Sequence, residues 1–225
     1  MKKKICLIGY NYGKNVLIKS INSINNFNLI GVCGQRARQA SHSSKFQYYT
    51  SWREMLKKLK PDLVVIAVPP LEQKKILYYL LKNKIQFLCQ KPLTNSLTDI
   101  YKLSLLNKTY RKKNLIDLNF ITIPSIIRFK DIIKKIKINK DTQIDIKWRF
   151  KPLSKNFSNS WKNNKKSLGG EINNFFFHLV SIMYFLFKAK KLQLIKKKQQ
   201  IYYFKLILKN SEVKIVFDPN NNKNL

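Results

Sequence analysis

Short apolar runs alternate with helically spaced segments over the first half of the chain. The runs that predict strands are 5–8, 29–33, 62–68, 86–89 and 115–120. The segments with apolar residues at helical spacing are 16–24, 52–59, 71–81 and 97–106. Because strands that alternate with helices through short loops form parallel sheets, residues 1–120 are predicted to be an α/β domain with a doubly wound sheet.

The pattern changes from about residue 121. One helix is predicted over 124–136, an alternating strand over 142–150, and a long apolar helix over 172–187. Three further strands are predicted over 192–195, 200–208 and 212–217, with a turn at 209–211. Residues 121–225 are therefore expected to form a smaller α+β domain with a mostly antiparallel sheet.

The apolar segment 172–187 is the only candidate for a membrane span, and it is a poor one. It contains Asn173, Asn174 and His178, and it is shorter than the hydrocarbon thickness of a bilayer requires. We expect a buried core helix there. Lys2 to Lys4 lead directly into a short strand instead of a cleavable signal sequence, so the sequence predicts a cytoplasmic protein.

The charge of the chain is extreme, with 45 Lys and Arg against 11 Asp and Glu and a net charge of +34. Such a balance attracts polyanions, so a basic nucleic-acid-binding protein is one hypothesis. The lysines are spread over nearly every segment, and binding proteins usually gather their charge on one face. A compositional bias toward Lys, Asn and Ile is the favoured explanation, although anionic small substrates would still be attracted.

The three cysteines are Cys6, Cys33 and Cys89, and each lies in or beside an apolar run. Their odd number and wide separation are typical of free thiols that pack as small buried hydrophobic groups in a reducing compartment. No metal site is predicted.

A glycine turn follows the first predicted strand, in the sequence Gly9-Tyr10-Asn11-Tyr12-Gly13. Dinucleotide-binding domains of the Rossmann type place a pyrophosphate at such a strand-to-helix turn, where amides and the helix dipole meet it. The motif is shorter than G-x-G-x-x-G and has Asn11 in place of the second glycine; asparagine tolerates left-handed backbone angles. An ordinary strand-to-helix turn is the alternative interpretation.

The end of the second predicted strand carries no acidic residue. A carboxylate there would bind the ribose hydroxyls of NAD, but the chain continues from Gly34 into Gln35 and Arg36. Arg36 and Arg38 are able to meet a 2′-phosphate, so the predicted cofactor is NAD(P), with NADP favoured. Pro69-Pro70 and Gln90-Lys91-Pro92 follow two later strands, and parallel strands bring such segments to one crevice.

This succession of motifs resembles the Gfo/Idh/MocA family of oxidoreductases. The resemblance rests on Gly9 to Gly13, Pro69-Pro70 and Gln90-Lys91-Pro92 in the first half. In the second half it extends over Trp148-Arg149-Phe150, Ser160-Trp161-Lys162, Gly169-Gly170 and His178. It implies hydride transfer between NAD(P) and a carbinol carbon of a sugar, nucleotide sugar or polyol.

The resemblance also implies roles for particular residues. Lys91 would polarise the reacting oxygen, His178 would act as the acid or base, and Asn174 lies one helical turn before His178. Asn119 and Trp161 would join Lys91 and His178 beside the substrate. The residues expected to bind the cofactor are Gly9, Tyr10, Asn11, Tyr12, Gly13, Gln35, Arg36, Pro69, Pro70, Gln90 and Lys91.

Several positions depart from the family pattern. Gln90 replaces a usual Glu, Gln73 a frequent His, and Asn174 and Ser181 replace common Asp residues. The second domain is also shorter than is usual in the family, so its sheet is expected to be truncated, with exposed edges and a possible homo-oligomer contact. A catalytically degenerate nucleotide-binding member of the family is therefore the alternative to an active enzyme.

Overall fold

The computed structural model describes most of the chain, in two compact units, Met1–Asp117 and Leu118–Leu225. The described ranges are 1–35, 45–94, 96–110, 113–136, 138–139, 142, 144–149, 175–188, 191–199, 201–208 and 211–218.

The first unit is built on a parallel six-stranded sheet. Its strands are β1 (Lys3–Ile8), β2 (Phe27–Cys33), β3 (Gln47–Tyr49), β4 (Leu63–Ile66), β5 (Gln86–Gln90) and β6 (Leu115–Asp117). Their spatial order is β3-β2-β1-β4-β5-β6, which is the order of dinucleotide-binding Rossmann folds. The predicted α/β fold with a doubly wound sheet is confirmed. The short edge strand β3 was not predicted, because three residues carry no periodicity.

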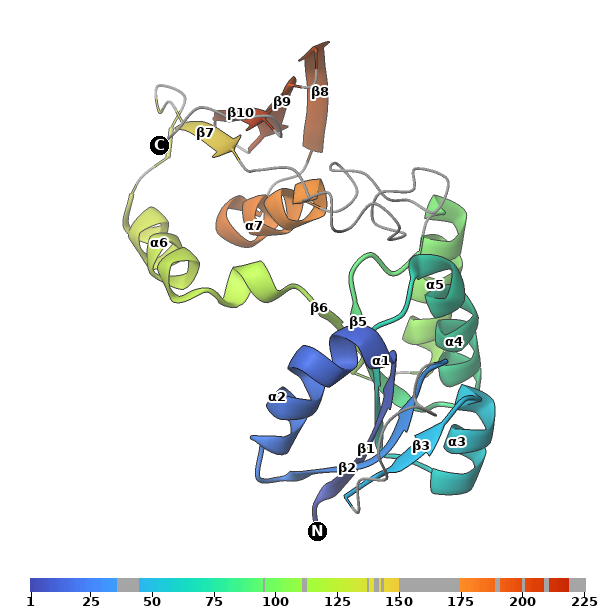
Figure 1. Ribbon diagram of the computed structural model, residues 1–225. Coiled ribbons are helices and arrows are strands. Elements are labelled where there is room, and N and C mark those ends of the chain that lie inside the picture. The colour runs from blue at the N-terminus through green and yellow to red at the C-terminus, as the bar shows by residue number, and fades with distance from the viewer. Residues whose placement is uncertain are drawn as a thin grey trace. The chain divides into compact units, whose positions relative to one another are not determined.

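Helices cover both faces of this sheet (Figure 1). A continuous helical segment of α1 (Tyr10–Tyr12), a π-helical turn (Gly13–Leu17) and α2 (Ile18–Asn22) packs on one face. The helices on the other face are α3 (Trp52–Leu59), α4 (Pro70–Lys82) and α5 (Leu97–Tyr110). Successive strands are added outward from β1 to β3 on one side of the sheet and from β4 to β6 on the other. This change of side places the two sets of helices on opposite faces.

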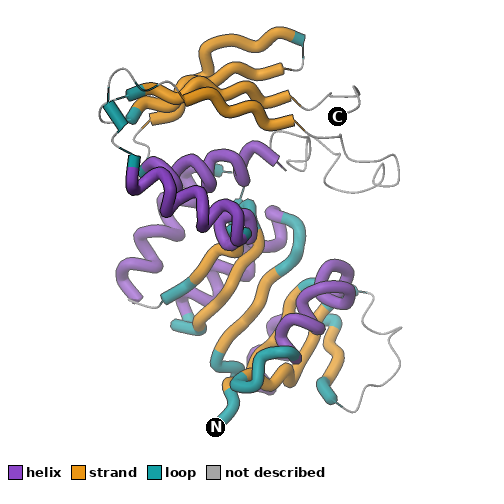
Figure 2. The backbone as a smooth tube through the Cα atoms, turned by 90° about the vertical axis from the view of Figure 1, so that its left-hand side faces the viewer, coloured by secondary structure: helices purple, strands orange, loops and turns teal. Residues whose placement is uncertain are grey.

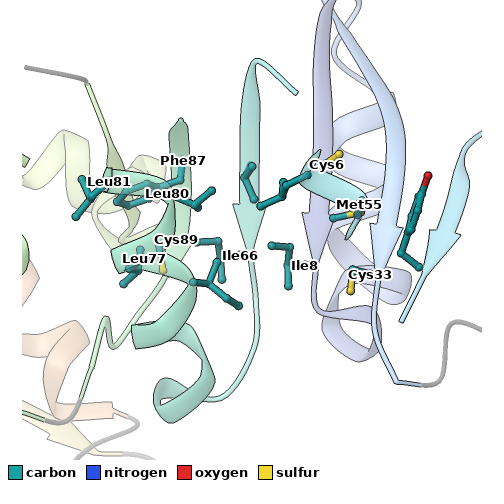
Figure 3. Packing of buried hydrophobic residues seen from close by; sticks show 14 of the residues in the cluster. Cys6, Ile8, Cys33, Met55, Ile66, Leu77, Leu80, Leu81, Phe87 and Cys89 are labelled. Carbon is teal, nitrogen blue, oxygen red and sulfur yellow. The ribbon is translucent and has the colours of Figure 1, made fainter. Parts of the chain in front are cut away.

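The core of the first unit follows the alternation of strand residues. Cys6 and Ile8 of β1 point to the side of α3 and α4, where they meet Ile66 and Cys89 (Figure 3). All three cysteines are free and buried, as predicted. Burial raises the pKa of Cys6 to about 12 and that of Cys33 to about 11, so both remain thiols at neutral pH.

The second unit is a four-stranded sheet covered on one face by helices (Figure 2). Its strands are β7 (Ile144–Arg149), β8 (Lys191–Lys198), β9 (Ile201–Ile207) and β10 (Glu212–Asp218). The order is β7-β10-β9-β8; β10 runs parallel to β7, and the other pairs are antiparallel. A short 3-10 helix (Asn119–Thr122), α6 (Pro124–Lys135) and α7 (Phe177–Phe187) complete this unit. The predicted α+β architecture is confirmed.

Helix α7 is the buried helix that the sequence predicted. Leu179, Ile182 and Met183 pack in one hydrophobic cluster with Ile215 and Phe217 of β10. Within the described ranges, no helix combines the length and apolar character that crossing a bilayer needs.

The turn from β1 into α1 depends on glycine. Gly9 has φ +119°, and an added Cβ would lie 2.2 Å from the backbone oxygen of Ala67. Gly13 has an ordinary helical φ, and an added Cβ there would lie 2.8 Å from Cδ2 of Leu7. The first contact is with backbone and the second with the end of a flexible side chain, so only Gly9 is irreplaceable on steric grounds.

These two glycines give a matched test of the turn. Gly9→Ala should lower the free energy of unfolding by about 3 kcal/mol, because it combines backbone strain with a clash that cannot relax. Gly13→Ala should cost about 1 kcal/mol, because Leu7 can change rotamer. Urea denaturation of both variants measures the difference. Equal losses would contradict the geometry described for Gly9.

Candidate active site

The predicted cofactor-binding residues of the first unit follow the carboxyl ends of neighbouring parallel strands. Gly9 follows β1, Gln35 follows β2, Pro69 and Pro70 follow β4, and Lys91 follows β5. Since parallel strands end at the same edge of a sheet, these segments border one crevice, which is where open α/β sheets bind ligands.

The glycine turn is tighter than its sequence suggested. The amide of Gly9 donates to the carbonyl of Cys33 at 2.9 Å, and the helix begins at once with Tyr10. Tyr10 to Tyr12 form the first helical turn, and no side chain caps it. Asn11 and Tyr12 are exposed at this helix start, where free amides and the helix dipole favour an anion.

Gly13 lies against β1 although it comes one residue earlier than the third glycine of G-x-G-x-x-G. The helix winds as a π-helix over Gly13–Leu17, in which each hydrogen bond spans one more residue than in an α-helix. The close approach of Gly13 to Leu7 is the packing that the third glycine normally permits. The shortened motif therefore retains both its tight turn and its close helix-to-strand contact.

The end of β2 lies directly against the glycine turn. An added Cβ on Gly34 would be 2.6 Å from Cβ of Tyr10, and the Tyr10 ring packs edge-on against Tyr48 at 6.1 Å. Gln35 follows as an exposed neutral side chain. Arg36 lies outside the described residues.

Gln73 fixes the backbone on both sides of Lys91. Its amide nitrogen, from α4, donates to the carbonyls of Gln90 at 2.8 Å, Pro92 at 2.6 Å and Leu93 at 3.3 Å. The side chain is 1% exposed, and the Lys91-Pro92 peptide bond is cis. By its resemblance to the family, Gln73 stands in place of a frequent histidine. The structure shows instead a buried donor that holds the Lys91 segment.

Asp117, at the carboxyl end of β6, was not among the predicted site residues. It ends β6 opposite Gln90 of β5, and the side-chain amide of Gln90 donates to its carboxylate. Burial raises the pKa of Tyr12, and the negative charge of Asp117 adds to that rise. The available signal was an acidic residue within the predicted strand 115–120, but its partner on the adjacent strand lies 27 residues away.

The remaining predicted residues belong to the second unit. His178 lies near the start of α7, only 6% exposed, with its ring stacked on Phe120 at 4.1 Å. Phe120 also stacks on Trp148 at 5.8 Å, and Asn119 is exposed at the start of the 3-10 helix. The hydroxyl of Ser181 donates to the carbonyl of His178 at 2.8 Å. Two further predicted site residues, Asn174 and Trp161, lie outside the described residues.

Comparison with known proteins identifies relatives of this arrangement. The model of the Gfo/Idh/MocA family, described as an oxidoreductase family with an NAD-binding Rossmann fold, matches residues 3–117. Comparison with curated proteins gave no match.

Similar solved structures span both units. The WlbA dehydrogenase from Thermus thermophilus, in complex with NAD and α-ketoglutarate, is 18% identical with a TM-score of 0.80, over 100% of this chain and 75% of its own. An NAD-binding protein from Listeria innocua is 17% identical with a TM-score of 0.81, over 100% and 69%. D-galactose-1-dehydrogenase from Rhizobium etli is 14% identical with a TM-score of 0.80, over 99% and 73%. At these identities the likeness concerns the fold.

The bracing role of Gln73 can be tested by stability. Gln73→Met should lower the free energy of unfolding by about 2 kcal/mol, because it leaves buried carbonyls without their donor. Gln86→Met is a matched control, since Gln86 makes one exposed hydrogen bond to the carbonyl of Lys113, and it should cost less than about 0.5 kcal/mol. Urea denaturation measures both, and equal effects would show that the Gln73 contacts contribute nothing.

Proposed function

The chain belongs to the Gfo/Idh/MocA oxidoreductase family, with its NAD-binding Rossmann fold, and on that premise we propose a specific reaction for it. The protein transfers a hydride between a nicotinamide dinucleotide and the carbinol carbon of a sugar-like substrate. The observation that carries the proposal is the convergence of the Gly9 turn and the braced Lys91 segment at one edge of a Rossmann sheet.

The residues at this edge fit a dinucleotide. Gly9 leaves no side chain over the strand ends, and the uncapped amides at the start of α1 suit the pyrophosphate. Gly34 approaches Tyr10 closely, so the end of β2 lies beside that turn. We assign this position to the adenosine half of the dinucleotide. When bound, the dinucleotide supplies the hydride acceptor for oxidation of a hydroxyl, or the donor for the reverse reaction.

Lys91 has the chemistry needed at the reacting oxygen. Its ammonium group would donate a hydrogen bond to that oxygen and stabilise the negative charge that develops there as the hydroxyl proton leaves. Gln73 fixes the backbone before and after Lys91, so the lysine side chain extends from a fixed backbone position. Catalysis of this kind depends on such preorganisation.

The family resemblance gives the proton-accepting role to His178. An imidazole suits this task, since it changes protonation near neutral pH. The Phe120 ring stacked on it restricts its orientation, and the hydroxyl of Ser181 is committed to the backbone. Asn174, four residues earlier in the sequence and outside the described residues, would orient the imidazole without adding charge.

The substrate we propose is a sugar with an anionic group, such as a nucleotide sugar. The net charge of +34 favours anions by long-range attraction. WlbA from Thermus thermophilus has been solved with NAD and UDP-GlcNAcA, and the Rhizobium etli relative is a D-galactose dehydrogenase. These ligands define the panel that should be tested first.

We further propose that NADP is bound at least as tightly as NAD. Cys33, Gly34 and Gln35 at the end of β2 provide no carboxylate to bind the 2′-hydroxyl or to repel a 2′-phosphate.

Calorimetric titration with NADH and NADPH tests this cofactor preference. The wild type should bind both, with NADPH the tighter. Gln35→Glu should shift the preference toward NADH by roughly tenfold, because one carboxylate attracts the ribose hydroxyls and repels the phosphate. If Gln35→Glu keeps the wild-type ratio of the dissociation constants for NADH and NADPH, the 2′-position of the cofactor does not lie beside residue 35. Absence of binding by the wild type would overturn the dinucleotide proposal.

Turnover of UDP-GlcNAcA, D-galactose and related sugars, followed by NAD(P)H absorbance, tests the reaction. Lys91→Met should lower kcat by about a hundredfold or more, as expected for loss of a group that acts in proton transfer and charge stabilisation. Lys58→Met, on the exposed face of α3, is the charge-matched control and should leave kcat unchanged. Cofactor binding with no turnover of any substrate by the wild type would favour the degenerate, binding-only interpretation.

A further inference from the structure

The pair formed by Gln90 and Asp117 places a carboxylate in the crevice. The two residues face each other on neighbouring parallel strands, so their side chains lie on the same face of the sheet. Leu88, two residues before Gln90, belongs to the hydrophobic cluster on the α2 side. Gln90 and Asp117 therefore continue that face to the carboxyl edge, directly before the Lys91 segment.

The influence of this carboxylate extends to Tyr12. It belongs to the first helical turn after Gly9, and the charge of Asp117 acts on its hydroxyl. Asp117 thus lies within electrostatic reach of the glycine turn as well as beside Lys91. A ligand that follows the crevice from the turn toward Lys91 would pass it.

The hydrogen bond from Gln90 orients Asp117 without neutralising it. The donor is an uncharged amide, so the negative charge remains, and one bond uses only part of the accepting capacity of a carboxylate. Both side chains are half-buried, which strengthens hydrogen bonds made there. Gln90 stands where the family resemblance leads one to expect Glu, so the pair keeps one carboxylate at this place, carried by β6 instead of β5.

We infer that Asp117 is a ligand-binding residue whose carboxylate accepts hydrogen bonds from the hydroxyls of a ring bound beside Lys91. Gln90 is its positioning residue. This inference rests on the proposed dehydrogenase function. Two rings supply that chemistry, the ribose next to the nicotinamide and the sugar substrate, and the experiment separates them.

Asp117→Asn removes the charge and keeps the possibility of an amide hydrogen bond from Gln90. If the ribose is the ligand, the Kd for NADH measured by calorimetry without substrate should rise roughly tenfold, the value of one hydrogen bond to a charged group. If the sugar is the ligand, the Kd for NADH stays constant and the KM of the sugar rises instead. Asp62→Asn is the control, because Asp62 accepts a hydrogen bond from the amide of Lys4 at the amino-terminal ends of β4 and β1, away from the strand ends that carry Asp117.

The reversed pair, Gln90→Glu with Asp117→Asn, provides the second variant. It returns one carboxylate and one amide to the same place, so affinity should recover to within about threefold of the wild type. A purely structural role predicts that Asp117→Asn alone behaves as the wild type, since the hydrogen bond between the side chains survives.

Unchanged Kd for NADH and unchanged KM in Asp117→Asn would overturn the assignment of Asp117 and leave the proposed function intact. Failure of the reversed pair to recover affinity would likewise overturn it. Failure of the wild type to bind NADH or NADPH would overturn the proposed function, and the role of Asp117 with it.

Discussion

The close approach of two backbones at Gly9 and Ala67 is the constraint on which the first unit depends. No side chain can stand at residue 9, because a Cβ would lie 2.2 Å from the carbonyl oxygen of Ala67. The turn therefore folds tightly over the ends of β1 and β4, and α1 begins at Tyr10 with its amides uncapped. A looser turn would move this helix start away from the strand ends, and the proposed anion site formed by amides and dipole would be lost.

The same edge of the sheet is organised by neutral amides. Gln73 donates to three carbonyls around Lys91, and Gln90 donates to Asp117. Amides fix backbone and side chains without altering the charge of the crevice, whereas an imidazolium or a second carboxylate there would alter it. Gln73 and Gln90, two of the residues that depart from the family pattern, are thus structural donors in this chain. Within the described residues, this arrangement pairs the Asp117 carboxylate with the residue directly before Lys91.

The scarcity of acidic residues makes the position of each one informative. Asp62 accepts from the amide of Lys4, and Asp99 pairs with Lys74 at 2.7 Å, which holds α4 to α5 and lowers the pKa of Asp99. Both carboxylates therefore stabilise the fold through interactions with Lys4 and Lys74. Asp117 is instead held by an uncharged donor, the side-chain amide of Gln90, at the carboxyl end of β6. The excess of lysine is spread over both units, in keeping with a compositional origin for most of it.

The sequence by itself determined the elements whose signal is local. Apolar periodicity gave α3 at its observed bounds and β4 as a strand buried between two layers. Tertiary structure alone decided what depends on pairing between distant segments. Strand β3 exists because it pairs with β2, and the roles of Gln73 and Asp117 follow from partners 17 to 27 residues away. The physical reason is that side-chain periodicity reports which face of an element is buried, whereas a hydrogen bond across strands depends on register, which only the folded sheet fixes.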